Sequence, residues 1–382
     1  MKYRNFKNEL QISQLGLGCM RFPVLNDDNA KIDEEQAERM ILHCYENGVN
    51  YYDTAYPYHV GTSEKFVGKV IQKNRLRDKI HLATKNPVWQ ITEHQGFYNV
   101  FEEQLQNLQT DYIDFYLMHS LNAGSWHMAK KHDIYRFMDT IKQDGRARQI
   151  GFSFHDNLNI FKEIVDAYDW DFCQIQLNYM DENYQAGIEG LQYASRKGLP
   201  VVIMEPLKGG RLAPVLTSSM QALFDKNNVT LTPVELALKY LFNMPEVSCV
   251  LSGASSYEQI VENVRTASTY GVGDLTQNEK KLIADMVEFY TSRTKVPCTG
   301  CLYCVDDCPQ RIPINIIFSL YNGRYIYEND KLARIQYDAH VPAKRRPDHC
   351  IECGQCESIC PQHIKIIDEL KVAHEDLLSI KL

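Results

Sequence analysis

The sequence lacks any long apolar run. No stretch approaches the roughly 20 consecutive apolar residues that a membrane-spanning helix needs. The first residues, Met1-Lys2-Tyr3-Arg4, lead into polar sequence rather than into a secretory signal. We therefore expect no membrane contact and a cytoplasmic location, where thiols stay reduced.

The sequence also lacks an excess of positive charge. Its 41 Lys and Arg residues are outnumbered by 49 Asp and Glu residues, so the formal net charge is −8. A protein that binds nucleic acid needs a basic face for the phosphates, so no nucleic-acid partner is expected. With 382 residues, the chain has room for one large domain and a smaller one.

A third absence concerns glycine. No Gly-x-Gly-x-x-Gly fingerprint follows any early apolar run, and Leu15-Gly16-Leu17-Gly18 lacks the third glycine, which argues against a Rossmann domain. Instead, short β-branched runs alternate with segments of helical period. The candidate strands are residues 15–18, 50–53, 80–84, 112–118, 147–151, 172–177, 201–204 and 249–251. Eight such units in order predict an α/β fold, a closed (β/α)8 TIM barrel, over residues 1–292.

Cysteine, by contrast, is abundant at one end. Eight of the 12 cysteines lie in residues 298–382. They form two runs of the pattern C-x2-C-x2-C-x3-C-P, namely Cys298, Cys301, Cys304 and Cys308, and then Cys350, Cys353, Cys356 and Cys360. This spacing is typical of [4Fe–4S] clusters, and the fourth cysteine of each run ligates the other cluster in two-cluster ferredoxins. The pattern predicts two clusters, with Cys308 completing the second site and Cys360 the first.

A disulfide framework and a structural zinc site remain open as alternatives for the cysteine runs. Disulfides would suit an exported protein, but no secretory signal precedes the crowded end. Structural zinc usually takes its ligands from two separated C-x2-C pairs rather than from a dense run of four. The remaining cysteines lie singly among apolar neighbours and are expected to be buried, and Cys19, at a strand end, is the one that could face an active site.

Four polar residues follow three successive candidate strands. Asp53 ends the second strand and Tyr58 lies just beyond it, while Lys85 and His119 follow the third and fourth. In a barrel these strand ends meet at one mouth. We expect the ammonium to lower the pKa of the tyrosine, the carboxylate to hold the ammonium, and the imidazole to bind a carbonyl. Such a set suits protonation of an oxygen that gains charge as hydride reaches its carbon.

The first 290 residues resemble the aldo-keto reductase family in motif order. The motifs are Leu15–Arg21, Asp53-Thr54-Ala55-Tyr56-Pro57-Tyr58 with Ser63-Glu64, Thr84-Lys85, Asp111–Asp114 with Met118-His119, Gly151-Phe152-Ser153, Gln174–Asn178, Gly253–Ser256 and Glu262-Asn263. The resemblance implies a reductase that uses NADPH or NADH, with Asp53, Tyr58, Lys85 and His119 as its catalytic tetrad. Tyr58 matches the family's acid by its distance from Asp53, and Tyr56 is expected to be a wall of the pocket.

The resemblance also implies cofactor contacts. Ser153 and Gln174 match residues that hold the nicotinamide carboxamide, whereas the matching Asn is Phe154, followed by His155. Met204 stands where an aromatic residue often stacks on the ring. The turn Lys208, Gly209, Gly210 and Arg211 suits a pyrophosphate. Gly253, Ser255, Gln259, Glu262 and Asn263 match the adenosine segment, but Gly253 and Gln259 stand where Lys and Arg often grip a 2′-phosphate, so both cofactors remain open.

Residues 293–382 are expected to form a small, mainly α-helical, ferredoxin-like iron–sulfur domain. The two cysteine runs are separated by 41 residues with helical character at 316–322 and 330–339. Aldo-keto reductases with such a tail are a recognised subgroup, which this sequence resembles. The basic run Lys344-Arg345-Arg346 is either a solvated loop or a docking site for an acidic ferredoxin- or flavodoxin-type partner.

The sequence predicts an oxidoreductase that moves a hydride between a nicotinamide and a small carbonyl or alcohol substrate, with Trp89 and Trp126 as aromatic pocket walls. Nicotinamide moves electrons in pairs and each cluster moves one, so a flavin mediator is possible. In a second hypothesis, a ferredoxin-linked enzyme uses the clusters to feed a non-nicotinamide acceptor in the barrel. In a third, the tail is a sensor or docking module on a conventional reductase.

Overall fold

The computed structural model describes the whole chain except Asp27, Thr299, Cys301, Leu302 and Pro361. The described residues form two compact units. The first contains Met1–Ala213 and Leu231–Thr276, and the second contains Pro214–Thr230 and Gln277–Leu382. The boundary at residues 292 and 293 stays a prediction, and helix α11 (Gln277–Arg293) groups with the second unit.

A closed barrel of eight parallel strands forms the centre of the first unit, as the sequence predicts. The neighbours in order are β10, β3, β4, β5, β6, β7, β8 and β9. The strands are β3 (Leu15–Gly18), β4 (Tyr51–Asp53), β5 (His81–Asn86), β6 (Ile113–Leu121), β7 (Ala147–Phe154), β8 (Phe172–Gln176), β9 (Val201–Met204) and β10 (Val247–Ser252). All are largely buried, because the barrel interior and the helix layer cover both faces.

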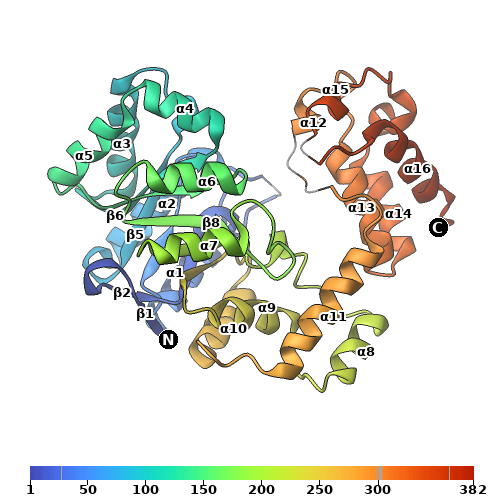
Figure 1. Ribbon diagram of the computed structural model, residues 1–382, viewed down its shortest axis with the longest axis horizontal. Helices are drawn as coiled ribbons and strands as arrows, with labels where there is room; N and C mark the ends of the chain where they lie inside the picture. Colours follow the sequence, from blue (N-terminus) through green and yellow to red (C-terminus); the bar gives the residue numbers. More distant parts are fainter. Residues whose placement is uncertain (27, 299, 301–302, 361) are drawn as a thin grey trace. The chain divides into compact units, whose positions relative to one another are not determined.

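Helices connect the strands and lie outside them (Figure 1). They are α1 (Glu34–Glu46), α2 (Ser63–Lys73), α3 (His94–Leu108), α4 (Ala123–Lys131), α5 (Ile134–Gln143), α6 (Leu158–Asp166), α7 (Gly187–Arg196), α9 (Pro233–Phe242) and α10 (Tyr257–Thr269). Local sequence sets their starts. Thr232 accepts a hydrogen bond from the Glu235 N–H, the Glu235 carboxylate accepts one from the Thr232 N–H, and Pro233 occupies the first turn.

A short antiparallel hairpin precedes the barrel and was not predicted from sequence. It pairs β1 (Tyr3–Asn5) with β2 (Gln11–Ser13). Between these strands, Phe6 packs edge-on against Phe115, with ring centroids 5.2 Å apart, and lies 6.0 Å from Phe172. The hairpin therefore contributes an aromatic side chain to the core inside the barrel.

The second unit is helical. It contains α8 (Ser218–Lys226), α11, α12 (Tyr303–Asp306), α13 (Ile314–Ile326), α14 (Asp330–His340), α15 (Gln355–Ser358) and α16 (Ile366–Ser379). The two predicted helical segments thus correspond to α13 and α14. Helices α13, α14 and α16 share a core that includes Phe318, Tyr337 and Leu370. None of the described helices is long and apolar enough to cross a membrane.

Candidate functional site

A buried lysine joins three of the four predicted catalytic residues. Lys85 on β5 is fully buried, and its Nζ donates to Asp53 Oδ1 at 2.5 Å and to the Thr54 carbonyl at 2.7 Å. The same Nζ lies 3.3 Å from the hydroxyl of Tyr58. Strand register explains this meeting, since β4 and β5 are adjacent parallel strands whose carboxyl ends open on the same mouth.

His119, near the end of β6, completes the group. Its ring centroid lies 5.9 Å from that of Tyr58, and the Trp89 ring packs against it at 5.1 Å. The His119 Nδ1 is buried and has no hydrogen-bond partner among the residues described. Burial, together with the charges of Lys85 and His155, lowers the pKa of His119 well below its ordinary value. The imidazole is therefore neutral at physiological pH and can form a hydrogen bond with a substrate carbonyl.

Burial dominates the acidity of Tyr58. It raises the pKa of the phenol above its ordinary value, although the charge of Lys85 opposes the shift. The expected net lowering of this pKa is therefore wrong, because the cost of burying a phenolate exceeds the attraction of one ammonium that Asp53 already engages. For Lys85, burial disfavours the charge, but Asp53 and Tyr58 outweigh it and raise the pKa. A protonated phenol beside an ammonium is a proton donor.

A large cavity opens at this mouth, with about 2080 Å³ of empty space that includes open solvent. All four residues line it. Most of the predicted cofactor residues line it as well, namely Ser153, Gln174, Met204, Gly209, Gly210, Gly253, Ser255, Gln259, Glu262 and Asn263. Lys208 and Arg211 lie on the same turn without lining the cavity, and Lys208 forms an ion pair with Asp181.

The cavity offers unused polar groups to a nicotinamide carboxamide. Gln174 Oε1 is buried without a hydrogen-bond partner in the described part of the chain, while its Nε2 lies 3.7 Å from the Met204 sulfur. The Ser153 hydroxyl accepts from the Ser120 N–H at 2.8 Å, which leaves its own hydrogen free to donate. A carboxamide has one acceptor and two donors and could satisfy both side chains, so the residues fit this group.

At the predicted adenosine segment, the polar side chains of Ser255, Gln259, Glu262 and Asn263 are neutral or negative, and the Arg21 side chain lies beside Gly253. Asn263 Nδ2 donates to Ser252 Oγ at 2.8 Å, and Glu262 accepts from the Thr232 hydroxyl at 2.8 Å. Gln259 Oε1 accepts from the Ser255 N–H at 2.9 Å. These bonds hold the β10–α10 loop in one conformation. Among the described residues that line the cavity, the two Lys or Arg side chains are Arg21 and Lys85.

Several residues that line the cavity were not predicted as site residues, among them Arg21, His155 and Glu205. Arg21, in the 3-10 helix η2 (Cys19–Arg21), contacts Glu205 just after β9, with Nη2 and Oε1 2.7 Å apart. His155, just after β7, has a pKa lowered by burial. Arg21 and Glu205 are separated by 184 positions, so no local pattern could have paired them.

Two expectations about the pocket walls are corrected by the structure. Tyr56 does not line the cavity, since its hydroxyl donates to Glu103 at 2.8 Å. Trp126 does not line the cavity either. It is 1% exposed and packs against Trp170. Cys19 is completely buried, as expected for the single cysteines, and it does not line the cavity. Trp89 is not among the lining residues either, but its ring lies against the ring of His119, which does line the cavity.

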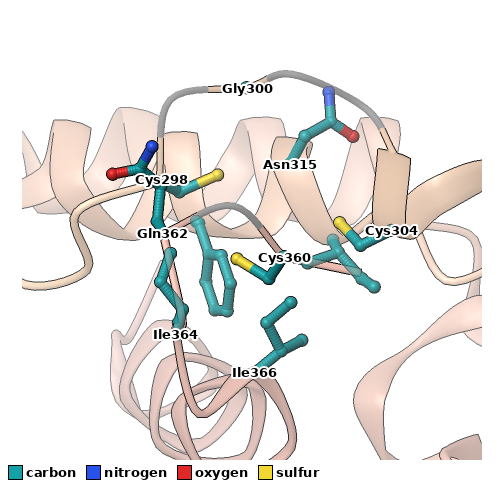
Figure 2. A pocket seen from close by; sticks show the side chains of 10 residues that line it. Cys298, Gly300, Cys304, Asn315, Cys360, Gln362, Ile364 and Ile366 are labelled. Carbon is teal, nitrogen blue, oxygen red and sulfur yellow. The ribbon is translucent and has the colours of Figure 1, made fainter. Parts of the chain in front are cut away.

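The cysteine runs line two separate cavities, each with about 350 Å³ of empty space that includes open solvent. The first cysteine site is lined by Cys298, Cys304 and Cys360, whose sulfur atoms face a shared space with apolar walls from Phe318, Ile364 and Ile366 (Figure 2). The second cysteine site is lined by Cys308, Cys350, Cys353 and Cys356. Each site therefore takes the last cysteine of the other run. Cys301 lies outside the described residues.

The lining of these two sites suits iron–sulfur clusters. The described cysteines are free thiols. A cubane cluster is larger than a single metal ion and takes thiolate ligands on several iron atoms. Cavities ringed by thiols with apolar walls suit the larger group.

Comparison with known proteins identifies both parts. The model of the Aldo/keto reductase family matches residues 14–277, more than two thirds of the chain. The chain belongs to the aldo/keto reductase family. A model described as a 4Fe-4S dicluster domain matches residues 297–365. The protein is therefore an NAD(P)H-dependent oxidoreductase of this family with an iron–sulfur domain, as the resemblance implied.

Relatives cover the barrel part. An uncharacterized oxidoreductase, YqkF, from Bacillus subtilis is 28% identical over 75% of this chain and 94% of its own. L-galactose dehydrogenase from Arabidopsis thaliana is 28% identical over 74% of this chain and 93% of its own. The solved aldo-keto reductase AKR11C1 from Bacillus halodurans, holo form, is 27% identical with a TM-score of 0.62, covering 75% of this chain and 96% of that one.

Proposed function

We propose that Tyr58, Lys85, Asp53 and His119 carry out hydride-linked carbonyl chemistry in the barrel cavity on a small carbonyl or alcohol substrate. The supporting observation is the buried contact of Lys85 with both Asp53 and Tyr58 at the mouth of the barrel. A bound NADH or NADPH supplies the hydride. Ser153 and Gln174 would hold its carboxamide, and Met204 would pack on the ring.

Each residue has a defined task in carbonyl reduction. The neutral His119 imidazole donates a hydrogen bond to the carbonyl oxygen and polarises it, which requires its proton on the ring nitrogen that meets that oxygen. As the carbon gains a hydride, the oxygen gains negative charge and Tyr58 transfers its phenolic proton to that oxygen. Lys85 stabilises the phenolate left behind, and Asp53 keeps Lys85 in position. A proton from solvent then restores Tyr58, and the reverse sequence oxidises an alcohol.

We further propose one [4Fe–4S] cluster at each cysteine site. Cys298, Cys301, Cys304 and Cys360 would hold the first, and Cys308, Cys350, Cys353 and Cys356 the second. The crossed arrangement of the described cysteines supports this assignment. Such thiols require a reducing compartment, so we place the protein in the cytoplasm. Lys344 and Arg345 are exposed, which leaves them available to an acidic ferredoxin- or flavodoxin-type partner.

The test is anaerobic purification with iron, sulfide and flavin analysis, followed by separate titrations with NADH and NADPH. Carbonyl-dependent oxidation of the nicotinamide is then measured for the Tyr58→Phe variant. We expect a loss of at least about 100-fold, because the proton donor is gone. Tyr56→Phe is the matched control and should keep normal turnover, since Tyr56 contacts Glu103 rather than the cavity.

Normal turnover of Tyr58→Phe would overturn the catalytic assignment. Reduction driven by ferredoxin or dithionite without any nicotinamide would favour the ferredoxin-linked hypothesis, in which the clusters supply the electrons. Less than about eight irons per chain in a freshly purified protein would contradict the assignment of two clusters, because each [4Fe–4S] cluster contains four.

A further inference from the structure

The two cysteine runs differ at one backbone position. The residue two places after the first cysteine has a left-handed backbone in both runs, and it is Gly300 in the first (φ 73°) and Glu352 in the second (φ 55°). Glycine adopts this conformation without steric cost, whereas a residue with a Cβ does not. The second run therefore has a charged side chain at the position where the first run has glycine.

The Glu352 side chain forms an ion pair with helix α16. Glu352 Oε1 lies 2.6 Å from Lys371 Nζ. Lys371 directly follows Leu370, which lines the second cysteine site, and the backbone N–H of Glu352 lies 3.4 Å from the Cys350 sulfur and points to it as a donor. One ion pair thus lies between the loop that carries a ligand cysteine and the helix that forms a wall of the same cavity.

We propose that the charges of Glu352 and Lys371 act in opposite directions on the reduction potential of the cluster at the second cysteine site, and that their pairing keeps the two effects in balance. This inference rests on the proposed function, in which that site holds a [4Fe–4S] cluster. Reduction adds one electron to the cluster and so increases its negative charge. A nearby ammonium stabilises the reduced form, and a nearby carboxylate destabilises it. While both groups are present, their opposite effects on the potential largely cancel. Removal of Lys371 alone should therefore lower the potential, and removal of Glu352 alone should raise it.

Both groups are about half exposed, at 56% for Glu352 and 50% for Lys371, so water and salt screen part of the effect. The first cysteine site has Gly300 at the equivalent position and no such carboxylate there. The charges of Glu352 and Lys371 accordingly act on one cluster, and the two clusters should respond differently to the removal of these charges.

The test is an anaerobic redox titration of the full-length holoprotein, followed by electron paramagnetic resonance, with iron and sulfide measured in every sample. Lys371→Met should lower the potential of one cluster, because Glu352 is left unbalanced. Glu352→Gln should raise the potential of the same cluster, because Lys371 is left unbalanced. The double variant and Lys371→Arg should both return close to the wild-type value, and the other cluster should stay unchanged throughout.

Two controls separate charge from structure. Glu352→Gly relieves the left-handed strain and removes the charge, so it should shift the potential as Glu352→Gln does. Lys226→Met removes another exposed, ion-paired lysine of the same unit, whose partner Asp285 lies outside the cysteine loops, and it should shift neither cluster.

Unchanged potentials in variants that contain both clusters would overturn the inference, as would shifts of the same sign from Lys371→Met and Glu352→Gln. Loss of iron from these variants would also overturn the inference, because the ion pair would then be needed for cluster assembly rather than for the reduction potential. A wild-type protein without a second cluster would instead contradict the proposed function.

Discussion

Lys85 and Asp53 form a contact of 2.5 Å between two side chains that are 0% and 3% exposed. Burial raises the pKa of Asp53, and the charge of Lys85 opposes that rise. Asp53 Oδ2 has no partner of its own among the described residues, so the ammonium is the main group that compensates the buried carboxylate. The contact places a proton donor, Tyr58, next to a fixed charge.

Removing one member of this pair should destabilise the barrel. Lys85→Met leaves a buried carboxylate without its counter-charge, and we expect a loss of about 3 kcal/mol or more in the free energy of unfolding. Urea unfolding measures it. The double variant Lys85→Met/Asp53→Asn should cost less than the sum of the two single variants, because it leaves no unpaired charge. Lys69→Met, at an exposed ion pair with Glu34, should change stability little, and equal losses at both lysines would contradict the prediction.

The rate of carbonyl reduction should be insensitive to pH through the neutral range. Tyr58 must be protonated to act as the acid, and its pKa lies above its ordinary value of about 10. The value of kcat/KM should therefore fall only as pH rises through this raised pKa. Asp53→Asn removes a carboxylate that raises the pKa of Tyr58, so the alkaline fall should move to lower pH. A fall below about pH 9 in the wild-type enzyme would contradict this assignment.

A variant at the last cysteine of one run should damage the cluster that is bound mainly by the other run. Cys308→Ser, although in the first run, should damage the same cluster as Cys353→Ser. Cys360→Ser should damage the same cluster as Cys304→Ser. Redox titration with electron paramagnetic resonance distinguishes the two clusters. If Cys308→Ser instead matched Cys304→Ser, each run would bind its own cluster and the crossed assignment would be wrong.

Cofactor choice should respond to one added cation at the adenosine segment. Gln259 lines the cavity near Glu262. Gln259→Arg supplies a guanidinium that can pair with a 2′-phosphate, so the affinity for NADPH relative to NADH should rise roughly 10-fold, the equivalent of about 1.4 kcal/mol. Fluorescence titration with each cofactor measures the ratio. Gln259→Met is the uncharged control, and an equal rise in this variant would show that charge is not the cause.

Local patterns in the sequence determined most of the fold. The alternation of short apolar runs with helical segments identified all eight barrel units, because strand and helix periods are set by neighbouring residues. The motif spacing around Asp53, Tyr58, Lys85 and His119 predicted that these side chains lie together, and they line one cavity, since the ends of parallel strands meet at one mouth. The cysteine spacing predicted that each site takes the last cysteine of the other run. The structure brings the described cysteines together in that arrangement.

Burial and the pairing of residues far apart in the sequence depended on distances that only the closed fold creates. Arg21 meets Glu205 because the first and seventh barrel strands bring their following loops to the same mouth. The rise in the Tyr58 pKa follows from burial, which no neighbouring residue in the sequence reveals. The sequence alone thus determined which elements form and predicted which side chains carry the chemistry. The tertiary structure decided charge balance, burial and long-range pairing, since these depend on desolvation and contact between residues far apart in the chain.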